Sequence, residues 1–196
     1  MAIYLIRHGE TDANAARVVQ HPDAPLSMRG LEQADRLATR LRDAGIGHVL
    51  SSDLARARMT AERLAAGIGV PLSFDAGLHE RNYGDVRGTP YAELTEDIFG
   101  PDYAPPGGET WDVFHARVDE AWARALAAAS RTDGHLAVVT HGLVCRAVVC
   151  RHCRVAAEVA SLRPWGNTSV TIVDGGAIRL LDCTAHLDGG VGGAAA

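Results

Sequence analysis

The stretch Ile3-Tyr4-Leu5-Ile6-Arg7-His8-Gly9-Glu10-Thr11, close to the start of the chain, decides the fold. It begins as an apolar run with β-branched side chains, which predicts a buried central strand. The run then ends in a cation, an imidazole and a glycine, where a loop is expected to begin. Ligands of an open α/β sheet sit at the carboxyl ends of its strands, so Arg7 and His8 predict a phosphate site that contains a nucleophile.

A second stretch repeats this arrangement. An apolar run at residues 136–139 predicts another buried strand, and it ends in Thr140-His141-Gly142. If the two strands are neighbours, their ends bring His8 and His141 together above the sheet. A lone histidine of this kind is more often structural, but the repeated context favours chemistry. One imidazole would attack phosphorus while the other, protonated, would neutralise charge on the non-bridging oxygens.

The first half of the chain alternates between strand and helix patterns. Ser27 is expected to cap a helix that runs to about Ala44, and Asp53 to cap a second helix over residues 54–66. Short strands are predicted at residues 48–51 and 71–74. This alternation predicts an α/β fold, a three-layer α/β/α sandwich whose mostly parallel central sheet carries helices on both faces.

The second half contains an irregular insertion before the pattern returns. Residues 76–109 show only one short helix pattern, at about 91–98, so we predict a lid or binding loop there. Thr110 should cap a long helix to about Ser130, and a further helix is expected over 143–153. Strands at 169–173 and 178–182 should form a hairpin. Residues 1–188 are predicted to form one domain, and the Gly- and Ala-rich residues 189–196 a disordered tail.

The bulk composition excludes several classes of protein. The 196 residues are 47% hydrophobic and carry a net charge of −5 with no basic run, which argues against a nucleic-acid partner. No apolar run is long enough to cross a bilayer and no signal-peptide pattern is present, so we expect a cytoplasmic protein without a membrane partner. The histidines show no metal-ligand spacing, and no metal is predicted. Cys150 and Cys153 are interpreted as small core residues.

Six motifs, in the correct order over about residues 3–173, give the chain a resemblance to the histidine phosphatase superfamily. This group includes cofactor-dependent phosphoglycerate mutases and many small phosphatases. The matching segments are Arg7-His8-Gly9-Glu10-Thr11 with Asn14, Leu26-Ser27 with Gly30 and Gln33-Ala34, Ser51 to Ala61 around Arg56, Glu80 with Tyr83-Gly84 and Gly88, Gly108-Glu109-Thr110, and Thr140-His141-Gly142 with Arg146.

The resemblance implies a covalent mechanism with two central residues. His8 would be the nucleophile and would carry a phosphohistidine intermediate, kept neutral by neighbouring cations. Glu80 would donate a proton to the leaving alkoxide and then, as a base, activate water. No metal takes part in this scheme.

The resemblance also implies a set of residues that hold the phosphoryl group. Arg7 and Arg56 would clamp its oxygens bidentately, and Asn14 would donate a neutral hydrogen bond. His141, as an imidazolium, would complete the site, with Gly142 beside it. The loop at residues 20–23 departs from the family pattern, with His21 in place of a glycine, and this leaves the placement of the rim open.

The choice between phosphatase and mutase rests on the lid. The segment Glu80-Arg81-Asn82-Tyr83-Gly84 is similar to the mutase form, in which the positions of Arg81 and Tyr83 contact substrate. Residues 88–110, however, contain no Lys or Arg and five carboxylates, and such a lid should repel a phosphoglycerate and a bisphosphorylated cofactor. We therefore favour a histidine-type acid phosphatase without a cofactor; 2,3-bisphosphoglycerate would be needed only by a mutase.

Other functions remain alternatives at this point. A non-catalytic phosphate-binding domain would be expected to lack some of the five central residues, all of which are present. A phosphohistidine protein phosphatase would be expected to have a reduced insertion, whereas a lid of roughly thirty residues favours a small-molecule phosphate ester. The pattern fits a monomer or a homodimer.

Overall fold

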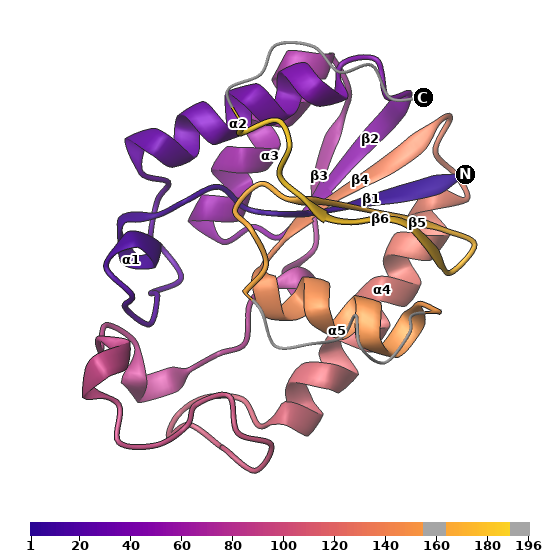
Figure 1. Ribbon diagram of the computed structural model, residues 1–196. Helices are drawn as coiled ribbons and strands as arrows, with labels where there is room; N and C mark the ends of the chain where they lie inside the picture. The colour runs from indigo at the N-terminus through magenta and orange to yellow at the C-terminus, as the bar shows by residue number, and fades with distance from the viewer. Residues whose placement is uncertain (155–163, 189–196) are drawn as a thin grey trace.

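The computed structural model describes residues 1–154 and 164–188, which include one six-stranded mixed sheet (Figure 1). The strand order is β3-β2-β4-β1-β5-β6, and β1 pairs in parallel with β4, as β2 does with β4 and β3. The hairpin strands β5 and β6 add an antiparallel edge. The strands are β1 Ala2–Arg7, β2 Ile46–Ser51, β3 Leu72–Phe74, β4 His135–Thr140, β5 Val170–Asp174 and β6 Ala177–Cys183.

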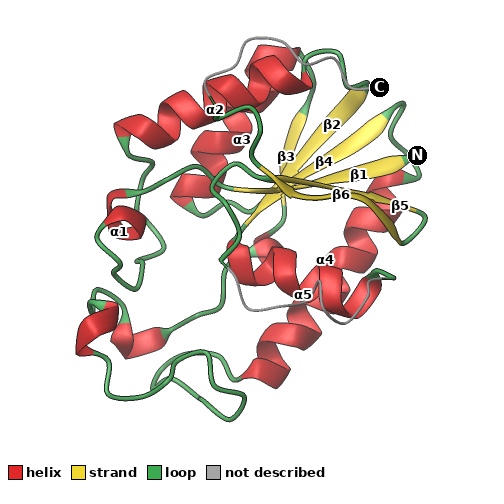
Figure 2. Ribbon diagram, viewed as in Figure 1, coloured by secondary structure: helices red, strands yellow, loops and turns green. Residues whose placement is uncertain are grey.

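Helices cover both faces of the sheet, as predicted (Figure 2). Helices α2 (Met28–Leu41) and α3 (Ala55–Ile68) pack together on one face. Helices α4 (Trp111–Ala129) and α5 (Gly142–His152) cover the other. A one-turn helix, α1 (Asp12–Ala15), follows the first strand and is capped by Thr11. The fold is therefore the predicted three-layer α/β/α sandwich.

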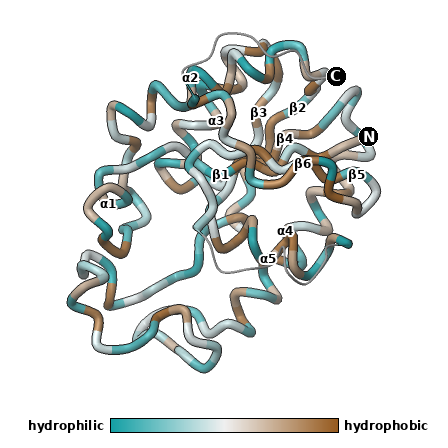
Figure 3. The backbone as a smooth tube through the Cα atoms, in the orientation of Figure 1, coloured by the Kyte–Doolittle hydropathy of each residue, from teal (hydrophilic) through white to brown (hydrophobic). Residues whose placement is uncertain are grey.

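The side chains of β1 alternate between two hydrophobic cores, one on each face of the sheet. Ile3 and Leu5 belong to the cluster beneath α4 and α5, whereas Ile6 belongs to the cluster beneath α2 and α3. Both sides of this strand are buried, so its sequence is almost continuously apolar. Figure 3 shows the hydrophobic residues concentrated along the central strands.

The neighbouring positions of β1 and β4 bring the two histidines together. Arg7 pairs in register with Thr140, and the backbone N–H of His8 donates to the Thr140 carbonyl over 2.9 Å. His8 and His141 are the next residues after these strands, so both leave the sheet at the same point of its carboxyl edge. The ring centroids of the two imidazoles lie 5.1 Å apart.

The predicted lid, residues 76–109, projects away from the carboxyl edge of the sheet as loops with three short 3₁₀ turns (Figure 1). These turns are Ala76–Leu78, Gly84–Val86 and Tyr91–Glu93. The lid has its own small core, formed by Val19, Tyr83 and Ile98. Backbone pairing of Val19 with Gly88 and Thr89 joins the lid to the loop after α1.

Several local predictions are wrong. The helix expected at 91–98 is only the turn Tyr91–Glu93, and α2 ends at Leu41 rather than near Ala44. Asp53 does not cap α3, because the helix begins one residue later with Leu54 as its N-cap. The Asp53 carboxylate instead lies 2.5 Å from the Nε2 atom of His79.

Cys150 is exposed and Cys153 half-buried, so the interpretation of both as core residues is wrong for Cys150. Helix α5 is apolar around most of its surface, and the pattern therefore could not assign a face to this position. The predicted tail, residues 189–196, lies outside the described residues. Among the helices that the structure describes, none is long and apolar enough to span a bilayer.

Candidate active site

His8 is held as a neutral imidazole whose Nε2 atom carries no proton. Its Nδ1 atom lies 2.6 Å from the Gly9 carbonyl oxygen, and because a carbonyl can only accept, Nδ1 carries the proton. Burial, together with the charges of Arg56 and Arg7, lowers the pKa of His8 well below its usual value. The Nε2 atom is therefore unprotonated and free to act as a nucleophile.

Two arginines flank this imidazole. The Arg56 Nε atom lies 3.3 Å from His8 Nε2, and its Nη1 donates to the His21 carbonyl over 3.1 Å. Burial lowers the pKa of Arg56 to about 10, so the side chain still carries its charge at neutral pH. Arg7 donates to the Trp165 carbonyl, while its buried Nε has no partner within residues 1–154 and 164–188. Both guanidinium groups line the cavity described below.

His141 lies beside His8 and is fully buried. Its Nε2 atom is 2.8 Å from the Ser52 hydroxyl, and its buried Nδ1 has no partner in the described part of the chain. Burial and the charge of Arg56 lower its pKa well below the usual value. Without a bound anion, burial and the surrounding cations therefore disfavour the imidazolium that the resemblance implies.

The Ser52 hydroxyl orients His141. If it donates to Nε2, the proton of the neutral ring lies on Nδ1, and Nδ1–H becomes a hydrogen-bond donor in need of an acceptor. We expect Ser52→Ala to lower kcat about tenfold, since one hydrogen bond to the transition state is weakened. Steady-state kinetics tests this, with Ser73→Ala, which removes the hydroxyl that contacts His48, as the matched control. A Ser52→Ala variant with unchanged kcat would contradict this role.

Glu80, at the start of the lid, lines the same cavity as His8. Its carboxylate oxygens accept from the backbone N–H groups of Arg81 (3.1 Å) and Leu143 (3.2 Å). Arg117 fixes the preceding backbone by donating to the carbonyls of Gly77 and His79, each over 2.9 Å. Burial raises the pKa of Glu80 above its usual value, even though neighbouring cations and these hydrogen bonds oppose the shift. A carboxyl group with a raised pKa is suited to proton transfer.

Asn14 and Gly142 both line the same cavity. The Asn14 Oδ1 atom accepts from the backbone N–H of Thr11, which orients the side-chain amide and leaves its NH₂ group available to a ligand. Gly142 begins α5, and a Cβ atom added there would lie 3.5 Å from Arg7 Nε. The first turn of a helix thus closes one side of the site, with its positive dipole end near the cavity.

The side chain of Arg81, which the resemblance predicts to contact substrate, is hydrogen-bonded within the lid itself. It is almost fully buried and donates to the carbonyls of Glu109, Ile98 and Tyr103. Its guanidinium lies 3.9 Å from the centre of the Trp111 ring. These contacts hold the lid together and occupy its donors, so its main role in this structure is to support the lid. Tyr83 lines the cavity as Arg81 does, and its buried hydroxyl has no partner among the described residues.

The site opens into a cavity of about 960 Å³ between the sheet edge and the lid. Its wall combines the predicted phosphate-binding residues with an apolar side that includes Val19, Tyr91 and Phe99. Of the five carboxylates in residues 88–110, only Glu109 lines it, and Arg117 pairs with that group at 2.7 Å. The other four do not line the cavity, so the lid presents less negative charge to a ligand there than its sequence predicts.

Comparison with known proteins agrees with this geometry. The family model of the histidine phosphatase superfamily (branch 1) matches residues 3–180. The chain belongs to this superfamily. Superfamily membership and the relatives together indicate a phosphatase- or mutase-type enzyme.

Curated relatives and solved structures point to different members of the superfamily. The probable phosphoglycerate mutase GpmB of Shigella boydii is 35% identical over 186 residues, covering 89% of this chain and 85% of that protein. A mycobacterial glucosyl-3-phosphoglycerate phosphatase, solved with VO3, has a TM-score of 0.77 and 28% identity, covering 88% and 90% of the two chains. The α-ribazole phosphatase of Shigella flexneri has a TM-score of 0.79 and 27% identity, covering 94% and 97%.

Sequence reasoning missed several residues that hold this superfamily site together. Asn167 donates to the His8 carbonyl over 3.1 Å, Trp165 accepts from Arg7, and Arg117 positions the Glu80 loop. All three are remote in sequence from the histidines, and the pattern around them carries no signal. Ser52 lies within the motif around Arg56, but nothing in that motif indicates its contact with His141. Within the two described segments, no three potential metal-ligating side chains gather at one place.

Proposed function

We propose that this protein is a metal-independent phosphomonoesterase that hydrolyses a small phosphorylated metabolite through a phosphohistidine intermediate on His8. The observation that carries the proposal is the state of His8. Its Nδ1 proton is held by the Gly9 carbonyl, and its unprotonated Nε2 faces Arg56 in the cavity. A neutral nucleophile beside two buried cations is suited to attack on an anionic phosphate ester.

The first step transfers the phosphoryl group to the enzyme. The His8 Nε2 lone pair forms a bond to phosphorus as the ester P–O bond breaks. Arg7, Arg56 and the Nδ1–H group of His141 stabilise the non-bridging oxygens. Glu80, whose raised pKa favours the protonated form, gives its proton to the leaving alkoxide. The first product is an alcohol.

The second step releases phosphate. Glu80 is now ionised and takes a proton from a water molecule, whose oxygen bonds to phosphorus as the P–N bond to His8 breaks. Inorganic phosphate leaves, and both His8 and Glu80 return to their starting protonation states. No metal and no bound cofactor enters the proposed cycle.

A phosphoglycerate mutase is the second candidate, favoured by the names of the curated relatives. In that reaction phosphohistidine would pass its phosphoryl group to the substrate instead of to water, with 2,3-bisphosphoglycerate to prime the enzyme. Four of the five lid carboxylates do not line the cavity, so the charge of the lid weighs less against a doubly anionic mutase substrate than its sequence predicts. Both candidates share His8, and they differ in the acceptor of the second step.

Phosphate release in the presence of EDTA distinguishes these candidates. The wild type is assayed with para-nitrophenyl phosphate and a panel of sugar and acid phosphates, and in parallel for conversion of 3-phosphoglycerate to 2-phosphoglycerate with added 2,3-bisphosphoglycerate. The proposal predicts hydrolysis that does not need a metal. Mutase activity that exceeds hydrolysis would favour the second candidate, and silence in both assays would leave a phosphate-binding domain.

A further inference from the structure

The cavity carries far more positive charge than one phosphate group needs. Among the residues that the structure describes, two carboxylates, Glu80 and Glu109, line it, whereas the whole chain has a net charge of −5. A phosphate monoester supplies at most two negative charges, so the arginines exceed what it can neutralise. The seven arginines that line the cavity are Arg7, Arg17, Arg56, Arg81, Arg87, Arg117 and Arg146.

Four of these arginines already have partners. Arg81 and Arg117 are used within the lid, as described above. Arg7 and Arg56 belong to the phosphate site beside His8. The remaining three are therefore the ones that a second part of the ligand could engage.

The side chains of Arg17 and Arg87 make no hydrogen bond or ion pair to any of the residues 1–154 and 164–188. The two residues come from the segments that join the lid to the loop after α1. These segments pair through the backbone, from Gly88 N–H to the Val19 carbonyl (2.7 Å) and from Tyr91 N–H to the Arg17 carbonyl (2.9 Å). Arg17 adopts a left-handed backbone conformation with φ of 55°, which is uncommon outside glycine and typical of functional positions.

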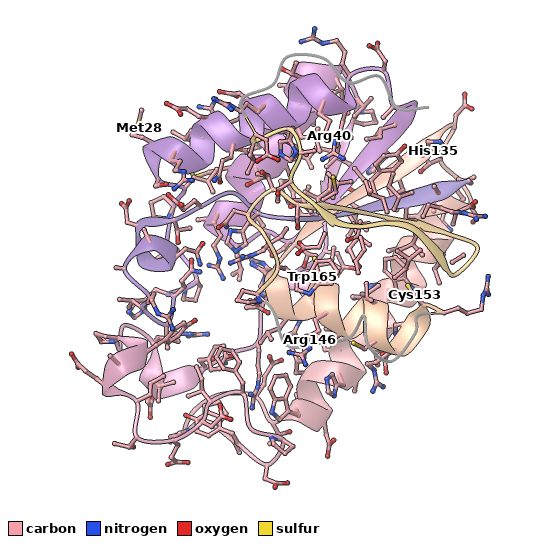
Figure 4. All side chains as sticks on the ribbon, viewed as in Figure 1. Met28, Arg40, His135, Arg146, Cys153 and Trp165 are labelled. Atoms are coloured by element: carbon pink, nitrogen blue, oxygen red, sulfur yellow. The ribbon has the colours of Figure 1, made fainter. Side chains whose placement is uncertain are left out.

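Arg87 acts on the phosphate site even in the absence of ligand. Its charge, with that of Arg7, contributes to the lowered pKa of Arg56. Repulsion among unpaired arginines disfavours the empty cavity and is relieved when anions bind. Arg146 lies on α5 (Figure 4) and also makes no ion pair in the described part of the chain, but it belongs to the motif that contains His141.

We propose that Arg17 and Arg87 form a second anion subsite, and that the substrate is a phosphate monoester carrying another anionic group, either a carboxylate or a second phosphate. This inference rests on the proposed phosphatase function of the same cavity. The planar guanidinium groups match both kinds of oxyanion. The subsite would select such substrates over phosphate monoesters whose alkyl or aryl group carries no charge.

Matched substrates test the subsite. Glycerol 3-phosphate and 3-phosphoglycerate differ only in a hydroxymethyl group against a carboxylate, and fructose 6-phosphate and fructose 1,6-bisphosphate differ in one phosphate. The kcat/KM of each is measured for the wild type and for Arg17→Gln/Arg87→Gln. The control is Arg42→Gln/Arg131→Gln, which removes two exposed charges outside the cavity.

We expect the wild type to prefer the more anionic member of at least one pair by about tenfold. The preference, which is a ratio measured within one variant, should fall to within about threefold in Arg17→Gln/Arg87→Gln. The pair that shows the effect tells whether the second anion is a carboxylate or a phosphate. Absence of a preference in the wild type, or a preference that survives the double substitution, would overturn the subsite.

A binding measurement separates this proposal from the proposed function. Calorimetric titration of His8→Ala with the same four compounds involves no turnover. If the enzyme hydrolyses nothing but binds the anionic members more tightly in an Arg17- and Arg87-dependent manner, the subsite stands and the phosphatase proposal fails. If the enzyme hydrolyses the esters but neither binding nor turnover depends on Arg17 and Arg87, the phosphatase proposal stands and the subsite fails.

Discussion

Replacement of His8 by alanine is expected to lower phosphate release by roughly four orders of magnitude or more, because the reaction loses the atom that accepts the phosphoryl group. The remaining groups can still bind the ester, but they cannot form the intermediate. His141 cannot replace the lost nucleophile, since its Nε2 contacts Ser52 and its side chain is fully buried. The measurement is phosphate release from para-nitrophenyl phosphate.

Two controls make this result specific. His8 is buried, so His8→Gln, which retains more side-chain volume, is assayed beside His8→Ala, and thermal unfolding confirms that both fold. His48→Ala removes a histidine from β2 that hydrogen-bonds to Ser73 and lies outside the cavity. We expect full activity from that variant. Activity in His8→Gln within tenfold of the wild type would contradict a nucleophilic role.

Substitution of Glu80 by glutamine should have the second largest effect. General acid–base catalysis typically contributes about 10²- to 10⁴-fold, and we expect a loss of this size for alkyl phosphates. Para-nitrophenolate leaves without protonation, so with para-nitrophenyl phosphate only the second step should slow. The expected result is a burst of about one equivalent of para-nitrophenolate, followed by slow turnover.

The matched control for this variant is Glu96→Gln, an exposed lid carboxylate that does not line the cavity. It should behave as the wild type. Equal losses in Glu80→Gln for alkyl and aryl esters, without a burst, would contradict the assignment of both proton transfers to Glu80.

The pH dependence of kcat/KM should place the optimum on the acidic side. His8 must be neutral, and its lowered pKa keeps it so well below the usual histidine range, which extends activity toward low pH. Glu80 must be protonated to act as an acid, and its raised pKa retains that proton to a higher pH than an ordinary glutamate would. For alkyl esters kcat/KM should therefore fall as pH rises through the Glu80 pKa, and Glu80→Gln should abolish this alkaline limb.

The fold and the central pair of residues could be predicted because local sequence determines them. A buried parallel strand is apolar on both faces and ends where a loop begins, so Ile6-Arg7-His8-Gly9 and Val139-Thr140-His141-Gly142 show both the strand and the site. The hairpin was predictable for a similar reason. Gly175 and Gly176 both adopt positive φ, as a tight turn between antiparallel strands requires.

The partners of these residues could not be predicted, because tertiary contacts determine them. Asp53 has the sequence of a helix cap but contacts His79, next to Glu80. Arg81 fits a substrate contact by position, yet three carbonyls of the lid surround it. His141 was expected to be charged, and only its burial beside Arg56 shows that the charged form is disfavoured. Whether the lid attracts or repels an anionic ligand likewise depends on which of its carboxylates line the cavity.

The phosphorylated enzyme itself tests the central claim most directly. Glu80→Gln is mixed with ³²P-labelled para-nitrophenyl phosphate, quenched within the burst, and divided between acid and alkali before peptide mapping. The account predicts protein-bound label that is lost in acid, retained in alkali and located on the peptide that contains His8. Label that survives acid, label on another residue, or a burst without any protein-bound label would contradict it.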